Sequence, residues 1–384
     1  EEMSSASYLV VLLGYAIGLG NIWRFPYLVG KWGGGAFLVA YVVCLLFVAV
    51  PLFFIELVMG QHTRLSTIEC FRKIHPRWVG LGYGQALMLF FFLSYYNVLL
   101  AYSCNYIAAS LRYPLPWTHD SDLTDSMTAA EAFWTKDVLN RLDAPHNGPI
   151  TGRLQGHLLL GLAVVWTLTF LAVAWGKRVL AKVTWVTVLA PVVLLAVLIF
   201  QSSRLEGAAQ GVEFYMGKFD AAVLTDIKMW ADACGQILFS LGPGMGTAIT
   251  MSSYTKPKED VFRVCVTVAI CNSMFSIAGG FAIFSIVGEL ARVTGRTVAQ
   301  VAATGGTGLA FVTMAHGILS FGSASNVVSV CFFVMLLNLG LDSTFAVVET
   351  FVCYIQDFCD KHGHHQPKSR LVLGLCLICF ATGV

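Results

Sequence analysis

Long stretches without a charged residue constrain the fold of this chain more than any other feature. The clearest of them cover residues 32–55, 83–111, 183–203, 264–288 and 297–341. A helix that spans a bilayer needs about 20 mostly apolar residues, and each stretch exceeds that length. A transmembrane β-barrel would instead show alternating segments of about 10 residues. We therefore expect an all-α, multi-pass membrane protein whose apolar surface faces the lipid bilayer.

The composition excludes several other classes of protein. Apolar residues make up 57% of the chain and charged residues 12%, roughly half the charged share of a soluble domain. So much apolar surface excludes a disordered chain, and 11 Cys in 384 residues are too few for a disulfide-stapled scaffold. The net charge is only +2 and forms no basic patch, so we expect no nucleic-acid partner.

The apolar runs and the charges between them predict nine helices in a single domain over residues 1–384. We place the helices at about 7–30, 35–60, 82–112, 156–175, 180–202, 228–255, 261–290 and 325–357, and from about 370 onward. The last run stops at Val384, too early for a complete span. We therefore expect the sequence to belong to a longer protein in which the ninth helix continues.

Loop charge predicts the orientation of these helices. The loops 61–79, 176–182, 255–263 and 357–370 hold 13 of the 24 Lys and Arg residues, whereas segment 113–155 is acidic. Cytoplasmic loops of membrane proteins carry an excess of Lys and Arg. The short basic loops and the N-terminus should therefore face the cytoplasm, and we expect the protein to lie in the plasma membrane.

The first and sixth predicted helices contain breaks of their own. Residues 14–21 read Gly-Tyr-Ala-Ile-Gly-Leu-Gly-Asn, and residues 239–246 read Phe-Ser-Leu-Gly-Pro-Gly-Met-Gly. Glycine and proline destabilise a helix interior, although small residues can also serve close helix packing. Two broken helices five apart indicate an inverted repeat with a binding site at the breaks. The first repeat would cover about 7–202, and the second would begin near 228 and remain incomplete.

Ionisable residues inside the predicted helices are the strongest functional candidates. Asp342 has no Lys or Arg within 40 residues before it or 18 after it. Because burying a lone carboxylate is costly, we expect a bound cation beside it; a protonated structural Asp or an ion pair with a distant helix is the alternative. Glu56 should accept hydrogen bonds from a broken helix, and Glu349 could line an inner path. Arg24 either guards an outer path or extends its charge to the membrane surface.

Six short motifs occur in order along almost the whole chain. They cover residues 14–27, 33–37, 51–61, 94–97, 235–242 and 339–343. Their residues closely resemble the neurotransmitter:sodium symporter family (solute carrier 6-like), which includes amino-acid, GABA, glycine and betaine carriers. The resemblance implies the 5+5 inverted-repeat fold of the bacterial leucine transporter, truncated here in helix 9. It also implies alternating access coupled to two sodium ions and, in most animal members, to chloride.

The resemblance further implies residues for each ion. The first sodium ion would contact the Ala16 carbonyl, Asn21, Ser240 and Asn272. The second would contact the carbonyls of Gly14, Ile17 and Leu339, with Asp342 and Ser343. Chloride would contact Tyr41, Gln236, Ser240, Asn272 and Ser276. Oxygen ligands suit a hard cation. Chloride-independent bacterial relatives carry a carboxylate in place of Ser276, so we expect chloride dependence here.

Gly18 is the residue that predicts the substrate class. Monoamine carriers of the resembled family have Asp at this position to meet the amine, whereas amino-acid carriers have Gly because the substrate brings its own carboxylate. We therefore expect a small amino acid or amino-acid-like zwitterion. The expected contacts are Tyr15, Ala16, Gly18, Gly20, Phe92, Tyr96, Phe239, Ser240, Gly242, Met245, Ser343 and Val347. The expected gate residues are Arg24, Tyr96 and Phe239 on the outer side and Tyr254 and Asp357 on the inner side.

Three other functions compete with sodium-coupled symport of a zwitterion. A monoamine symporter is the alternative within the class, and Gly18 argues against it. An ion channel would show rings of like charge or a repeated filter segment, and the sequence shows neither. An enzyme is the weakest alternative, because the sequence has no nucleophile elbow, phosphate-binding loop or zinc motif.

Overall fold

The computed structural model describes residues 3–118, 129–140, 154–302 and 308–384, so most of the acidic segment predicted at 113–155 lies outside the described part. All the regular elements within these ranges are helical. The main ones are α1 (Ser5–Ala16), α2 (Leu19–Ile22), α3 (Arg24–Lys31), α4 (Gly35–Cys44), α5 (Val50–Thr63), α6 (Thr67–Ile74), α7 (Val79–Ser110), α9 (Gly156–Val173), α10 (Lys177–Ser202), α11 (Ala208–Val212), α12 (Ile227–Leu241), α13 (Thr247–Ser252), α14 (Val261–Thr294), α16 (Met314–Ile318), α17 (Ser325–Lys361) and α18 (Lys368–Thr382).

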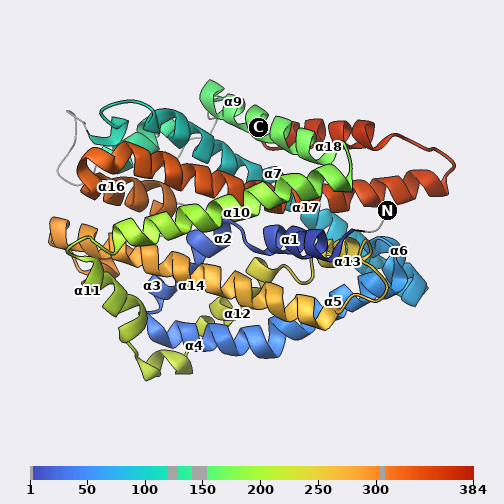
Figure 1. Cartoon of the computed structure of the whole chain (residues 1–384), viewed down its shortest axis with the longest axis horizontal. Coiled ribbons are helices and arrows are strands. Elements are labelled where there is room, and N and C mark those ends of the chain that lie inside the picture. Colours follow the sequence, from blue (N-terminus) through green and yellow to red (C-terminus); the bar gives the residue numbers. More distant parts are fainter. Residues whose placement is uncertain (1–2, 119–128, 141–153, 303–307) are drawn as a thin grey trace, which may run out of the picture.

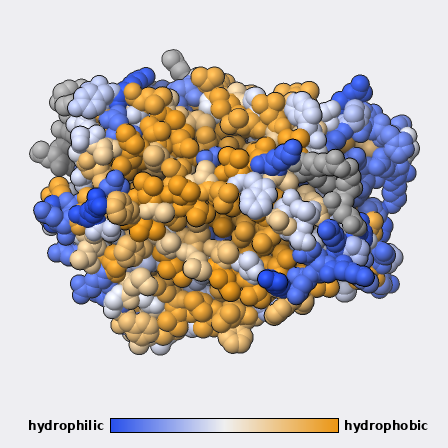
Figure 2. Space-filling model, viewed as in Figure 1, coloured by the Kyte–Doolittle hydropathy of each residue, from blue (hydrophilic) through white to orange (hydrophobic). Residues whose placement is uncertain are grey.

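The long helices match the predicted spans. In the described part, six helices are long and apolar enough to cross a membrane, and α1 with the segment Leu19–Lys31 makes a seventh span bent by 56°. Figure 1 shows most of the long helices running along the long axis of the molecule. Figure 2 shows a broad hydrophobic surface between two hydrophilic ends. Side chains such as Phe47, which is 76% exposed, contribute to the apolar exterior expected beside lipid.

The first predicted helix is interrupted where its glycines occur. α1 ends at Ala16, and both Ile17 (φ −83°, ψ 98°) and Gly18 (φ −130°, ψ −169°) are extended. The Gly18 N–H donates to Asn21 Oδ1 at 2.9 Å. The predicted helix 7–30 is therefore three helices, and the amide that would have continued the ladder to the Gly14 carbonyl bonds to a side chain instead.

The sixth predicted helix is interrupted in a second way. α12 ends at Leu241, and α13 begins at Thr247. Between them Gly242, Gly244 and Gly246 have φ of 74°, 88° and 77°. These left-handed angles favour glycine, since a Cβ destabilises this backbone conformation.

The broken helices lie inside a shell of continuous ones. α1 packs against α10, α14 and α17, while α2 packs against α12 and α14. α17 also packs along α7, where Gly340 permits a close approach: a Cβ on it would lie 2.0 Å from a Leu100 methyl carbon. Irregular backbone is thus enclosed by protein, as a bilayer interior requires.

Candidate functional site

A small cavity of about 30 Å³ lies where the two broken helices meet. Its lining residues are Tyr15, Ala16, Gly18, Leu19, Gly20, Asn21, Phe92, Tyr96, Phe239, Ser240, Met245, Ser343 and Val347. Eleven of the twelve residues predicted to contact substrate are among them. The twelfth, Gly242, is not, because the Tyr15 hydroxyl donates to the Gly242 carbonyl at 2.9 Å and fills the space beside it. Gly242 therefore does not line this cavity, and Leu19 was not among the predicted contacts.

A second cavity of about 300 Å³ adjoins the first on the Arg24 side. Tyr96 and Phe239 line both cavities. The Tyr96 ring stacks on Phe92 with centroids 4.4 Å apart, and the Arg24 guanidinium lies 5.0 Å from the Phe239 ring centroid. The two aromatic side chains predicted as an outer gate therefore form a partition between the cavities. Arg24 also donates to the Gly235 carbonyl, at 3.4 Å.

A buried polar network joins helices α2, α12 and α14 beside the small cavity. Asn21 Nδ2 donates to Asn272 Oδ1 at 2.8 Å and to Ser276 Oγ at 2.8 Å. Asn272 Nδ2 donates to Ser240 Oγ at 3.0 Å. The structure thus brings together the side chains predicted for the first sodium ion, and Ala16 lines the same cavity. Amide and hydroxyl oxygens at this point suit a hard cation.

The side chains predicted for chloride border this network. Gln236 Nε2 donates to the Gly20 carbonyl at 3.2 Å, and the Tyr41 hydroxyl lies 3.3 Å from Ser273 Oγ. Gln236 Oε1 is buried without a hydrogen-bond partner in the described part of the chain. The amide, phenol and hydroxyl groups gathered here can donate hydrogen bonds, so the set fits an anion chemically. Ser273 was not predicted to take part.

Asp342 is 4% exposed and lies against the break in helix 1. A Cβ on Gly14 would lie 3.2 Å from Asp342 Cβ, and the neighbouring Ser343 hydroxyl donates to the Tyr15 carbonyl at 3.3 Å. Asp342 Oδ1 accepts a hydrogen bond from the Thr187 hydroxyl. Among the described residues the carboxylate forms no ion pair, so the alternative of a distant basic partner finds no support.

Two buried acidic residues outside the cavity lining, Glu56 and Glu349, each contact a named partner. Glu56 accepts a hydrogen bond from the Gly244 N–H at 2.8 Å, which agrees with the prediction that it binds a free amide of a broken helix. Glu349 is instead paired with Lys368 at 2.5 Å and does not line an open path. The Tyr254 hydroxyl lies 3.4 Å from Glu349 Oε1.

The second predicted inner-gate residue, Asp357, bonds to another element. Its carboxylate accepts a hydrogen bond from Ser66, which precedes α6. With Tyr254 attached to α17 through Glu349, the described contacts tie α6 and the end of α13 to the same helix.

The comparison with known families agrees with this geometry. The model of the family described as "Sodium:neurotransmitter symporter family" matches residues 3–384. The chain belongs to the sodium:neurotransmitter symporter family. Members of this family are multi-pass membrane transporters and not enzymes, in agreement with both expectations from the sequence.

Individual relatives in this family have several substrates in their names. The chain is 33% identical to the sodium- and chloride-dependent neutral and basic amino acid transporter B(0+) of Homo sapiens, over 99% of the chain and 66% of the relative. It is 34% identical to the sodium-dependent serotonin transporter of Drosophila melanogaster, over 98% and 62%. It is also 34% identical to the sodium- and chloride-dependent GABA transporter 2 of Rattus norvegicus, over 98% and 65%. The chain thus spans just under two thirds of the length of these relatives.

A solved structure supports the fold of this family member. The crystal structure of MhsT in complex with L-phenylalanine matches 100% of the chain and 79% of MhsT, with 25% identity and a TM-score of 0.82. The predicted fold of the bacterial leucine transporter, with broken helices 1 and 6, is therefore confirmed.

Proposed function

We propose that this family member carries a small amino acid or amino-acid-like zwitterion across the membrane by sodium-coupled symport. The observation that carries the proposal is the buried Asp342 carboxylate, which forms no ion pair with any described residue and lies beside a cavity at two helix breaks. Transporters of this architecture bind substrate and coupling ions at such breaks. The names of the relatives, which include sodium-dependent carriers of amino acids and GABA, point to the same activity.

Asp342 and the break in helix 1 form the candidate site for the second sodium ion. The Gly18 N–H bonds to Asn21 and leaves the Gly14 carbonyl without its helical donor, and Gly14 lies against Asp342. We assign Gly14, Ile17, Leu339, Asp342 and Ser343 to this ion. Since a cation here would contact α1 and α17 together, its binding would hold these two helices in one relative position.

The first sodium ion and the substrate would share the small cavity. Asn21, Asn272 and Ser240 would hold the ion, which supplies a positive charge for the substrate carboxylate. Gly18 keeps the space beside it open, because a Cβ there would lie 2.9 Å from Ser343 Oγ. The aspartate of a monoamine carrier would fill this space, and so we favour a zwitterion over a monoamine.

A chloride ion among Tyr41, Gln236, Ser240, Asn272 and Ser276 is the third part of the proposal. The buried hydroxyl and amide groups there carry no negative charge of their own, so a mobile anion would balance the adjoining sodium ion. Ser276→Glu should make uptake independent of external chloride, because a fixed carboxylate would replace the anion. Chloride titrations of uptake by the variant and the parent check this assignment; an equal chloride requirement in both would contradict it.

The proposed alternating access depends on the outer and inner gate residues. Tyr96 and Phe239 would open and close the outer side, with Arg24 above them, while Tyr254 and Asp357 belong to the inner side. We propose that the short basic loops and the N-terminus face the cytoplasm and that the protein lies in the plasma membrane. Residues 1–384 would form one transporter domain, with repeats at about 7–202 and from about 228.

The proposal is tested by uptake into lipid vesicles that contain the protein. Glycine, betaine, GABA, taurine, proline and leucine are each supplied with an inward sodium gradient, and equal potassium serves as the control. We expect saturable accumulation of at least one zwitterion with sodium only. Serotonin and dopamine are supplied in the same way, and their uptake without zwitterion uptake would favour the monoamine alternative. Uptake of every compound without sodium would contradict symport.

A further inference from the structure

Segment 206–217 runs along the outer half of α14 and ends beside the candidate chloride site. It contains Glu206, Gly207, α11 and the π-helical turn Glu213–Gly217. Both α11 and this turn pack on α14, and Figure 1 shows α11 at the end of the molecule opposite the N-terminus. The segment therefore extends from the surface of the molecule inward to the turn of α14 that follows Ser276.

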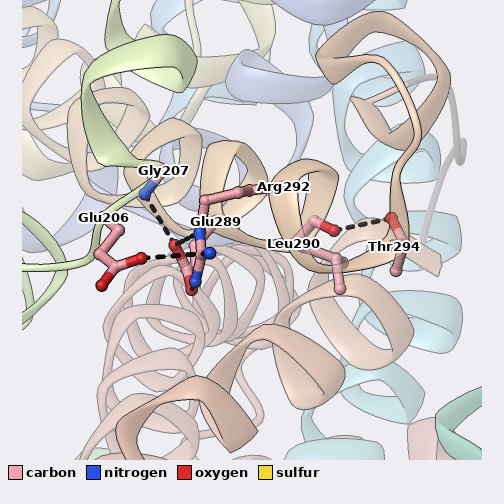
Figure 3. A network of polar contacts seen from close by, with 6 residues as sticks. All are labelled: Glu206, Gly207, Glu289, Leu290, Arg292 and Thr294. Atoms are coloured by element: carbon pink, nitrogen blue, oxygen red, sulfur yellow. Dashed lines mark hydrogen bonds and ion pairs between the residues drawn. The ribbon is translucent and has the colours of Figure 1, made fainter.

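A polar clamp fixes the outer end of this segment (Figure 3). Glu289 of α14 is 5% exposed and accepts a hydrogen bond from the Gly207 N–H at 2.7 Å. Arg292 donates to Glu289 at 2.7 Å and lies 3.1 Å from a Glu206 carboxylate oxygen. Because charged groups reinforce these hydrogen bonds, the clamp fixes the start of the segment against α14.

The middle of the segment touches the α14 backbone directly. A Cβ on Gly211 would lie 1.8 Å from the Phe284 carbonyl oxygen, and a Cβ on Gly288 would lie 2.3 Å from the Gly207 carbonyl oxygen. No side chain separates the two backbones at these points. A displacement of α14 would therefore require a matching displacement of α11.

The inner end of the segment is Tyr215, whose side chain is 0% exposed. Its hydroxyl donates to the Ile277 carbonyl at 3.1 Å. Its ring stacks on Phe284 with centroids 5.0 Å apart and planes 17° apart. A Cβ on Gly280 would lie 2.4 Å from the Tyr215 hydroxyl, so the glycine allows this contact.

The same turn of α14 is held from its other side by helix α2. A Cβ on Gly279 would lie 2.6 Å from Ile22 Cδ1. Asn21, directly before Ile22, donates to Ser276. Adjacent glycines thus admit Ile22 and Tyr215 against the turn that follows Ser276.

We propose that Tyr215 is a positioning residue for the anion site, which it serves through the Ile277 carbonyl without touching the ion. Its hydroxyl keeps the turn after Ser276 in place. The Ser276 hydroxyl then stays beside Asn21, within the proposed chloride site that also includes Tyr41. The inference rests on the proposed chloride site and adds a residue outside it.

The test is Tyr215→Phe, which removes the hydroxyl and leaves the stacked ring. The half-saturating chloride concentration for uptake should rise about two- to tenfold, as expected for loss of one hydrogen bond. The half-saturating substrate concentration at saturating chloride should stay unchanged. Tyr106→Phe is the matched control, because Tyr106 is equally buried and its hydroxyl has no hydrogen-bond partner among the described residues.

Three outcomes would overturn the inference in distinguishable ways. A chloride requirement in Tyr215→Phe equal to that of the parent would refute the role of Tyr215 alone. A rate reduced equally at every chloride concentration would show a merely structural role. Parent uptake that ignores chloride would remove the proposed anion site and this inference together.

A second measurement keeps the test decisive if the variant transports poorly. Chloride that binds the folded protein should raise its thermal midpoint in detergent. We expect the chloride concentration that gives half of this rise to shift upward in Tyr215→Phe but not in Tyr106→Phe. In a Ser276→Glu background, Tyr215→Phe should produce no chloride-dependent change. A shift that persists in that background would contradict the proposed route through Ser276.

Discussion

At the scale of single residues, the chemistry of the candidate site depends on Asp342. It is buried, receives one hydroxyl hydrogen bond from Thr187, and forms no ion pair in the described part of the chain. A carboxylate in such a place is costly unless something neutralises its charge. The proposed sodium ion, held with the Gly14 carbonyl, would satisfy this requirement and would explain why the residue lies beside a helix break.

Asp342→Asn should weaken sodium activation of uptake. Removing one partner of a buried charge pair costs about 2–5 kcal/mol, so the half-saturating sodium concentration should rise by about thirtyfold or more. Sodium titrations of uptake measure the effect, with surface expression measured in parallel. Asp360→Asn, a change at an exposed carboxylate on the same helix, should leave sodium activation as it was. Unaltered activation in Asp342→Asn would refute the assigned role.

Gly18→Ala should impair substrate binding. The added Cβ would lie 2.9 Å from Ser343 Oγ and 3.4 Å from the Tyr96 hydroxyl, so the cavity would become overpacked. The half-saturating substrate concentration should rise about tenfold. Gly374→Ala is the control, because a Cβ there meets nothing within 4 Å. Equal substrate affinity in both variants would place the substrate elsewhere.

The residue scale also shows where sequence reasoning stops. Asp342 stands out in the sequence by itself, as a lone carboxylate in a long run without Lys or Arg, whereas the expectations for Gly18 and the aromatic gate came from motifs that resemble the family. Thr187, Ser273 and Tyr215 could not, since each is one more hydroxyl in an apolar helix or loop and acquires its role only from a distant partner. The contact between Gly242 and Tyr15, 227 residues away, likewise has no signal in the sequence, and it keeps Gly242 out of the cavity lining.

At the scale of helices, the two interruptions differ in their physical origin. The break after Ala16 is stabilised by a side chain, since Asn21 Oδ1 accepts a hydrogen bond from the Gly18 N–H. The break after Leu241 depends on backbone freedom at three glycines with positive φ. Glu56 then binds the exposed Gly244 N–H. Both breaks could be predicted from clustered Gly and Pro, whereas the π-helical turn Leu45–Ala49 left no signal in an otherwise uniform apolar run.

Gly244→Ala should destabilise the protein through its backbone alone. A Cβ at this position meets nothing within 4 Å, yet φ is +88°. The left-handed conformation costs about 1–2 kcal/mol for a residue with a side chain. Thermal unfolding in detergent should show a lower midpoint than for Gly80→Ala, which adds an equally unobstructed Cβ in α7. Equal midpoints would show that the break tolerates other conformations.

At the scale of the whole molecule, long apolar helices surround an interior that holds the broken helices. Figure 2 shows the broad hydrophobic surface on one face of the molecule. The long apolar helices could be placed from length and hydropathy, because a bilayer requires about 20 apolar residues per span. Segment 206–217 was not predicted as a functional element, because its contacts with α14 depend on the assembled fold. The interior holds the breaks, the polar network and the two cavities separated by Tyr96 and Phe239.

The central claim is that sodium and a zwitterion cross together through this interior. The most direct measurement is the simultaneous net flux of radiolabelled sodium and of the best substrate into vesicles that contain the protein. We predict a constant ratio of sodium to substrate at all substrate concentrations, and loss of this fixed ratio in Asp342→Asn. Sodium flux that continues at the same rate without substrate, or substrate uptake that proceeds with no sodium movement, would contradict the account.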